Sequence, residues 1–161
     1  MTGAEFLAHT KKKVQILDGA MGTQLQKYGM PRGVCPEEWI LENPHVAQRV
    51  QSEYVEAGSD IIYAPTFGAN AVKLKNTRLS SDVAGTNSRL VELSKKVCGN
   101  ALVAGDISPL GVLMDLAGGY SFNDCVEIFK EQIYGLLQGG ADILVLETFI
   151  DLAEARAAAI A

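Results

Sequence analysis

The chain has 161 residues, of which 48% are hydrophobic and 20% are charged, as is typical of a globular protein of roughly one domain. Its formal net charge at pH 7 is -5, and the 14 basic residues are scattered apart from residues 11–13, which excludes a nucleic-acid-binding patch or a polybasic membrane anchor. No apolar run approaches the roughly 18 residues of a membrane span, and the N-terminus lacks a secretory pattern, so we expect a cytoplasmic protein.

Short apolar segments alternate with helical patterns along the chain. We expect strands at residues 14–17, 60–64, 101–105 and 142–146. Their near-continuous apolar character is typical of parallel strands that are covered on both faces. Residues 1–13 precede the first strand, and we interpret them as a flexible or helical extension.

Helix signals separate these strands. Asn43-Pro44 reads as a cap followed by proline at the first helical position, and this helix ends before Gly58. A second amphipathic helix is predicted within residues 82–97. A third follows Ser121, where apolar residues recur every three or four positions.

The C-terminal part contains a last helix and an irregular connection. Asp151, with Glu154 three residues later, resembles a capping box that opens an alanine-rich helix. We expect this helix to be incomplete at Ala161, because no glycine or proline ends it. We interpret the glycine-rich residues 114–120 as a connection rather than a mobile lid.

The alternation of strands and helices predicts a parallel sheet, either an open doubly wound sheet or a barrel of βα units. An internal repeat favours the barrel: residues 58–67 resemble residues 140–149, 82 positions later. Two units of about 41 residues fit this offset, and eight would need roughly 330 residues, as in (β/α)8 barrels. We therefore expect residues 1–161 to be the first four units, or half, of a TIM barrel, completed by a further segment, a second copy or another chain.

Polar residues follow the predicted strands at their carboxyl ends. Asp18, Asp106 and Glu147 each come directly after a strand, and Thr66 follows another. Because function in such barrels lies at the carboxyl ends of the strands, we expect these side chains to share one rim that attracts a metal ion or an ammonium group. Each acid could instead cap the next helix. The turn at residues 19–22 lacks a phosphate-loop pattern but offers amides to a carboxylate.

Four stretches of the chain, in order, resemble the homocysteine S-methyltransferase family, including the N-terminal homocysteine-binding domain of cobalamin-dependent methionine synthases. They are LDGAMGTQLQKYGM, residues 42–70, AGDISP and GGADILVLETF, and the resemblance runs from about residue 14 to the end. It implies zinc-dependent transfer of a methyl group to the sulfur of homocysteine.

The resemblance also implies roles for individual residues. The positions that match Asp18 and Glu147 bind the ammonium group of homocysteine, and amides near Gly19 and Ala20 bind its carboxylate. Thr66 and Asp106 match positions that line the pocket. No residue of this chain is assigned a catalytic or metal-binding role.

The sequence departs from the family in two respects. Ser108 stands where the family often has glycine. The family holds zinc with three cysteines, including an adjacent pair, in the second half of the barrel, and Cys35, Cys98 and Cys125 do not match them. We therefore expect the zinc ligands outside this chain, with cobalamin and methylfolate possible through other modules.

Three functions remain open at this point. The chain is the homocysteine-binding part of a methyltransferase, or a non-catalytic half barrel that pairs with itself or a partner. It could also belong to an unrelated metal-dependent barrel lyase or isomerase. The sequence does not identify the methyl donor, and it indicates three cysteines that are reduced and structural.

Overall fold

The computed structural model describes residues 2–112, 114 and 119–161, so residues 115–118 of the predicted connection lie outside the described part. In chain order the elements are α1 (Gly3–Thr10), α2 (Met21–Lys27), α3 (Pro36–Glu42), α4 (Pro44–Glu56), β1 (Ile61–Tyr63), α5 (Ala71–Leu74), α6 (Val83–Lys95), β2 (Leu102–Ile107), α7 (Phe122–Gln138), β3 (Ile143–Leu146) and α8 (Leu152–Ile160).

The sheet is parallel, as predicted, with the strand order β1-β2-β3. The expected strand at residues 14–17 is reduced to one parallel bridge between Leu17 and Ile61. This segment lies at the margin of the sheet with much of its apolar surface exposed, Val14 at 82% and Ile16 at 56%. It bonds to its neighbour only around residues 16–18, which is too little for a regular ladder.

Strand β2 is longer than predicted. It continues to Ile107 because Asp106 pairs with Val145 and Ile107 pairs with Leu146. Asp106 is therefore a residue of strand β2 rather than of the loop that follows it. Pairing with β3 holds its backbone in place.

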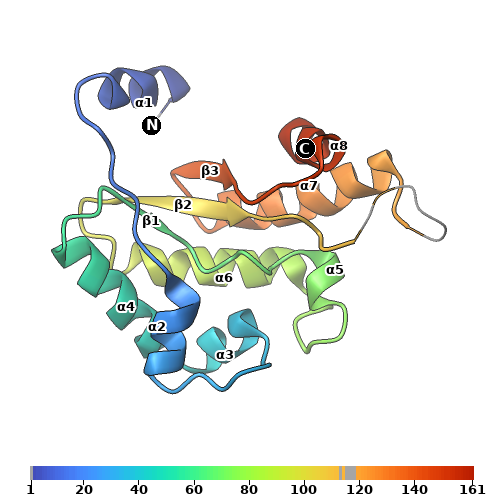
Figure 1. The fold of residues 1–161 in the computed structure, drawn as a ribbon, viewed down its shortest axis with the longest axis horizontal. Coiled ribbons are helices and arrows are strands. Elements are labelled where there is room, and N and C mark those ends of the chain that lie inside the picture. Colours follow the sequence, from blue (N-terminus) through green and yellow to red (C-terminus); the bar gives the residue numbers. More distant parts are fainter. Residues whose placement is uncertain (1, 113, 115–118) are drawn as a thin grey trace.

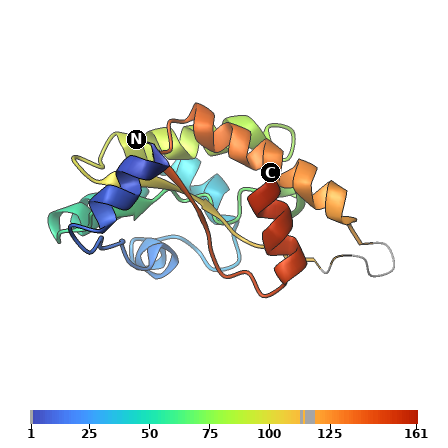
Figure 2. The same ribbon diagram turned by 90° about the horizontal axis from the view of Figure 1, so that it is seen from above.

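Long helices cover one face of the sheet. α6 and α7 lie side by side and both contact β2, and α8 packs on α7 (Figure 1; Figure 2). The largest hydrophobic cluster lies between these helices and the sheet and includes Ile62, Val103, Ile107, Phe129 and Leu136. A second cluster joins α2, α3 and α4 to α6.

Side-chain caps account for most helix starts. Ser121 and Asp124 form a complete capping box at α7, and Asp82 accepts the Gly85 N–H at α6. The predicted box at α8 forms only in part: Asp151 accepts the N–H of Ala153 and of Glu154.

Two predicted caps are used differently. The carboxylate of Glu154 does not return to residue 151; it is buried and accepts the Leu110 N–H at 2.6 Å, so it ties α8 to the end of the β2 region. Asn43 makes no side-chain cap on α4 and donates instead to the Trp39 carbonyl. In both cases a tertiary or preceding-helix acceptor replaces the local partner.

The internal repeat has a shared structure at the amino ends of β1 and β3. Gly58 and Gly140 have φ of 103° and 85°, which glycine adopts without strain. Two residues later, Asp60 accepts the Ile16 N–H at 3.1 Å and pairs with Lys13, while Asp142 accepts the Val103 N–H at 2.8 Å and pairs with Lys95. Each aspartate therefore bonds its strand to the preceding unit.

The N-terminal extension contains α1, which lies apart from the other helices beside the amino ends of the strands (Figure 1). A capping box of Thr2 and Glu5 starts it, and none of its residues is buried. In the described part of the chain, no helix combines the length and apolarity needed to cross a lipid bilayer.

Candidate functional site

A pocket of about 560 Å³ lies at the carboxyl ends of the strands. Of the residues predicted to form the site, Asp18, Gly19, Ala20, Asp106 and Glu147 all line it. Helices α2 and α3 complete the wall. The structure thus brings together residues that are far apart in the sequence, because parallel strands present their carboxyl ends at one edge.

Asp18 lies directly after the bridge at Leu17. Its Oδ1 accepts the Tyr63 N–H at 3.2 Å, which fixes the carboxyl group beside β1. Burial raises the pKa of Asp18 to about 6, backbone N–H bonds from Tyr63 and Asp18 itself oppose this rise, and the negative charge of Glu147 adds to it. Asp18 and Glu147 are therefore electrostatically coupled across the pocket.

Asp106 lies at the centre of the polar cluster. Its side chain is 5% exposed, and its Oδ1 is buried without a hydrogen-bond partner in the described part of the chain. Burial, together with the charge of Glu147, raises the pKa of Asp106 to about 8, although the ammonium of Lys73 opposes the rise. A carboxyl group in this setting is protonated at neutral pH.

Thr66 is not among the pocket-lining residues. It is fully buried, its Oγ1 donates to the Asp106 carbonyl at 2.9 Å, and the Asp106 N–H donates back to Oγ1 at 3.1 Å. Gln132 of α7, which was not anticipated, donates to the Thr66 carbonyl at 3.0 Å. Thr66 and Gln132 therefore hold the strand tip that carries Asp106.

Glu147 follows β3 and precedes an unusual backbone. Thr148 has φ of 58°, the left-handed region that a β-branched residue rarely adopts. Such a conformation costs on the order of 1–3 kcal/mol and persists where the surroundings enforce it. The turn at Thr148 changes the chain direction directly after Glu147, whose side chain lines the pocket.

The loop at Gly19 and Ala20 is braced from outside the pocket. The Tyr54 hydroxyl of α4 donates to the Ala20 carbonyl at 3.1 Å. A Cβ on residue 19 would lie 2.8 Å from that hydroxyl oxygen, so any other residue would require the Tyr54 ring to shift. Helix α2 begins directly afterwards at Met21, and its first residues also line the pocket.

Glu37 is a pocket acid that the sequence did not reveal. It lies at the start of α3, is 5% exposed, accepts the Gly68 N–H at 2.7 Å and accepts the Cys35 S–H at 3.2 Å. The proline at position 36 and the acids after it indicate a helix start. No local signal indicates that Glu37, rather than Glu38, turns inward.

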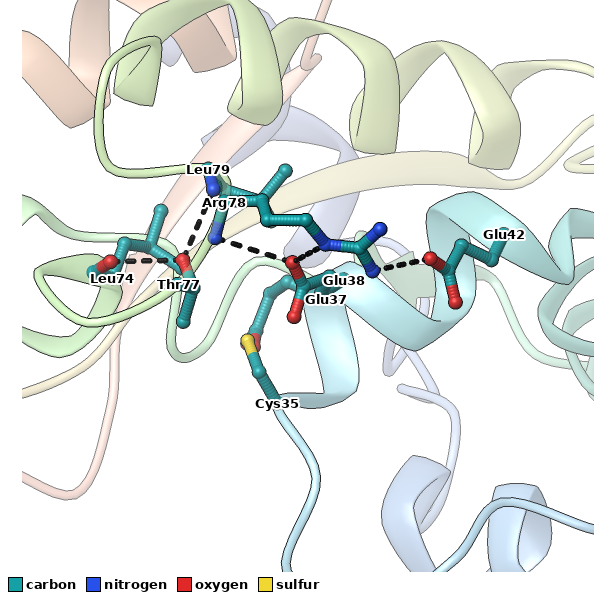
Figure 3. A network of polar contacts seen from close by, with 8 residues as sticks. All are labelled: Cys35, Glu37, Glu38, Glu42, Leu74, Thr77, Arg78 and Leu79. Carbon is teal, nitrogen blue, oxygen red and sulfur yellow. Dashed lines mark hydrogen bonds and ion pairs between the residues drawn. The ribbon is translucent and has the colours of Figure 1, made fainter.

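Arg78 fixes the position of α3 (Figure 3). Its Nε donates to Glu38 Oε1 at 2.7 Å, its second guanidinium nitrogen bonds Glu42, and its backbone N–H also reaches Glu38. Glu38 and Glu42 are separated by one helical turn, so one guanidinium spans both. This contact holds the helix that carries Glu37 against the loop after α5.

Ser108, the departure from the family pattern, has a defined structural role. Its Oγ accepts from Lys73 Nζ at 2.7 Å and donates to the Phe67 carbonyl. Lys73 Nζ also lies 4.5 Å from the centroid of the Phe67 ring. Burial lowers the pKa of Lys73, and Glu37 and Asp106 counteract this effect. The serine therefore holds a cation close to the acidic pocket.

The described residues do not fit a zinc site. Within residues 2–112, 114 and 119–161, no group of three or more His, Cys, Asp or Glu side chains is arranged to hold a metal ion. Cys35 precedes α3, Cys98 is buried after α6, and Cys125 is buried in the first turn of α7. No chemical step through a metal is therefore derived from these residues.

Comparison with known proteins identifies relatives along nearly the whole chain. A family model for homocysteine S-methyltransferase matches residues 15–161. Methionine synthase of Mycobacterium leprae (strain TN) is 28% identical over 167 aligned residues, which cover 96% of this chain and 14% of that protein.

Solved structures agree with this relationship. The metallated form of the homocysteine methyltransferase MmuM from Escherichia coli has a TM-score of 0.81 at 25% identity and covers 95% of this chain and 60% of its own. The apo form of MmuM gives 0.72, with 96% and 56% covered. The chain thus spans only part of each relative. As the motifs in its sequence indicated, it belongs to the homocysteine S-methyltransferase family.

Proposed function

We propose that this chain is the amino-acid-binding part of a homocysteine S-methyltransferase, which methylates the sulfur of homocysteine to give methionine. Its fold corresponds to the first four βα units of a (β/α)8 barrel, with residues 14–17 in the place of the first strand. One observation carries the proposal: Asp18 and Glu147, from opposite margins of the described sheet, line the same pocket.

The charges of the pocket support an amino acid as the ligand. We assign the ammonium group to Asp18 and Glu147, because charge-assisted hydrogen bonds to two carboxylates are strong and directional. The carboxylate of the ligand is assigned to the amides near Gly19 and Ala20, which lie on the same wall as Asp18. Asp106 contacts the ligand from the end of β2. Thr66 does not contact the ligand but holds the Asp106 backbone through two hydrogen bonds.

The cofactors belong to the proposal for the whole protein. Zinc is expected from ligands outside this chain, and cobalamin or methylfolate would act through other modules. The methyl donor and a cytoplasmic location stay predictions. Within this chain, the derived task is to bind and orient the amino-acid end of the substrate.

The open side of β3 supports a partner segment. Leu144 and Leu146 are each 39% exposed, and Ile150 and Leu152 after them are 94% and 77% exposed. An unpaired strand edge with apolar neighbours is normally covered. We propose that the second half of the barrel covers it. Sedimentation of the 161-residue chain tests this: a stable, well-folded dimer would instead favour a self-associating, non-catalytic module.

Isothermal titration calorimetry with two ligands tests homocysteine binding. L-homocysteine should bind, whereas 4-mercaptobutyrate, which has the same thiol and carboxylate without the amine, should bind at least about tenfold more weakly because Asp18 and Glu147 lose their partner. Asp18→Asn should reduce this preference, and Glu127→Gln, an exposed change on α7, should preserve it. Equal binding of the two ligands would contradict the proposal.

A further inference from the structure

The pocket contains more acid than the chain neutralises. Four carboxyl groups, those of Asp18, Glu37, Asp106 and Glu147, line one cavity of about 560 Å³. None of them forms an ion pair within the described part of the chain. Ionised carboxylates that line one partly dehydrated cavity repel one another, and a bound cation or proton relieves this repulsion.

Asp106 differs from Asp18 and Glu37 in the partners of its carboxyl group. Asp18 and Glu37 each accept a backbone N–H, whereas Asp106 Oδ1 is buried and has no partner among the described residues. The Asp106 backbone is held by Thr66 on one side and by pairing with Val145 on the other. The strand therefore places the Asp106 carboxyl group in the cavity wall, where it is 5% exposed.

The charges around Asp106 favour its protonated form. The ionisable groups that act on it or face the same wall are Asp18, Glu37, Tyr63, Lys73 and Glu147. Burial raises the pKa of Asp106 to about 8, with Glu147 as the next cause. Lys73 is the opposing cation, but its Nζ bonds Ser108 rather than a carboxylate. At neutral pH the empty cluster therefore binds one proton.

We propose that Asp106 exchanges its proton for the ammonium group of the ligand. In the empty pocket Asp106 is protonated, and in the occupied pocket its carboxylate faces the ammonium group. On binding, the O–H bond of Asp106 breaks, the proton passes to solvent buffer, and the resulting carboxylate adds a third negative group around the ammonium. The identity of the ligand rests on the proposed function. The exchange itself rests on the four acids and the unpartnered oxygen.

The exchange gives binding a pH dependence of defined sign. Below about pH 8 the site must lose a proton before or while the ligand enters, so affinity rises with pH, by at most about tenfold per unit for one proton. A neutral ligand of the same shape does not displace the proton. The pocket therefore discriminates against uncharged analogues without any steric barrier.

Calorimetry of the 161-residue chain with L-homocysteine at pH 7.0, in phosphate and in Tris, measures the number of protons released. Wild-type protein should release nearly one proton more than Asp106→Asn, and any proton from the ligand thiol is common to both proteins. Glu127→Gln, with its exposed acid on α7, should match wild type. Equal release from wild type and Asp106→Asn would overturn the exchange while leaving homocysteine binding, and hence the proposed function, intact.

Carbon-13 NMR titration of aspartate carboxyl groups in the ligand-free chain gives a test that needs neither the variant nor a ligand. One aspartate should titrate above pH 7, and its signal should be absent from Asp106→Asn if that variant folds. A chain in which no aspartate titrates above pH 7 would overturn the inference. If an aspartate titrates high but L-homocysteine does not bind the folded chain, the proposed function fails and the protonated site stands.

Discussion

The segment 58–67, which contains β1, and the segment 140–149, which contains β3, begin in the same way and end differently. Both start with a left-handed glycine, and in both an aspartate two residues later binds a backbone amide of the preceding unit and a lysine. These contacts close each unit onto the one before it. The shared residues at the amino ends therefore maintain the architecture.

The carboxyl ends of the two segments have diverged. Thr66 is fully buried between strand tips, whereas Thr148 is exposed and has φ of 58°. Phe67 is 41% exposed at the pocket, whereas Phe149 packs on Phe129 with ring centroids 5.9 Å apart. Identical residues thus have different contacts and exposure at the carboxyl ends of the two strands. Identity within the repeat therefore indicates a common role only at its amino end.

Position 147 should show the largest functional difference between the repeats, since Glu147 corresponds to Pro65 in the first segment. Glu147→Gln should weaken L-homocysteine binding about 10- to 100-fold, because a charge-assisted hydrogen bond is worth roughly 1.5–3 kcal/mol. Calorimetry measures the affinity. Unfolding stability should hardly change, and unchanged affinity would contradict the assignment of Glu147 to the ammonium group.

The shared amino ends should respond alike to mutation. Asp142→Ala should lower the free energy of unfolding by about 1–3 kcal/mol, because the Val103 amide loses its charged acceptor, and Asp60→Ala should lower it in the same way through the Ile16 amide. Lys95→Gln removes only the ion pair of Asp142 and should cost less than about 1 kcal/mol. Urea denaturation measures all three. A large loss of stability at only one of the two aspartates would show that the two segments are not equivalent even at their amino ends.

The same substitution at the two threonines should separate their roles. Thr66→Val should lower stability by about 1–2 kcal/mol, since the buried Asp106 N–H loses its acceptor. Thr148→Val should stay within about 0.5 kcal/mol, because that side chain is exposed and valine keeps the β-branch. Similar losses at both positions would remove the distinction drawn here.

The smallest expected effect concerns the strained turn. Thr148→Gly should raise the free energy of unfolding by up to about 1 kcal/mol, because glycine adopts φ of 58° without strain, although it also adds entropy to the unfolded chain. Thermal or urea unfolding measures it. A clear loss of stability would mean that contacts of the Thr148 side chain outweigh the strain.

The sequence predicted the features of this molecule that depend on local periodicity. α4, α6 and α7 lie where their apolar patterns indicated, and α8 lies where its cap residue and alanine-rich run indicated. Parallel strands then bring Asp18, Asp106 and Glu147 to one edge. The short helices α2, α3 and α5 were not anticipated, because four to seven residues are too few to display a helical period. The 14–17 strand was predicted from its apolar residues, which in the structure lie at the margin of the sheet.

The missed site residues depend on contacts between distant segments. Glu37 accepts the Gly68 N–H, and Arg78 binds Glu38 and Glu42 on the same helix from a loop about 40 residues away, contacts that no local pattern encodes. Gln132 could have been found: it lies on the apolar face of α7 between Phe129 and Leu136. A polar residue on such a face is normally hydrogen-bonded within the core. Here its partner is the strand tip beneath the pocket.

The contact between Gly19 and Tyr54 has a consequence for redesign of the substrate loop. Any side chain at position 19 displaces the Tyr54 ring and, with it, the hydroxyl that holds the Ala20 carbonyl. A library of variants at position 19 alone would therefore select for tolerance of a loosened α4 rather than for new ligands. Altered selectivity should be sought by varying positions 19 and 54 as a pair, so that a smaller ring partner on the helix makes room for the new group on the loop.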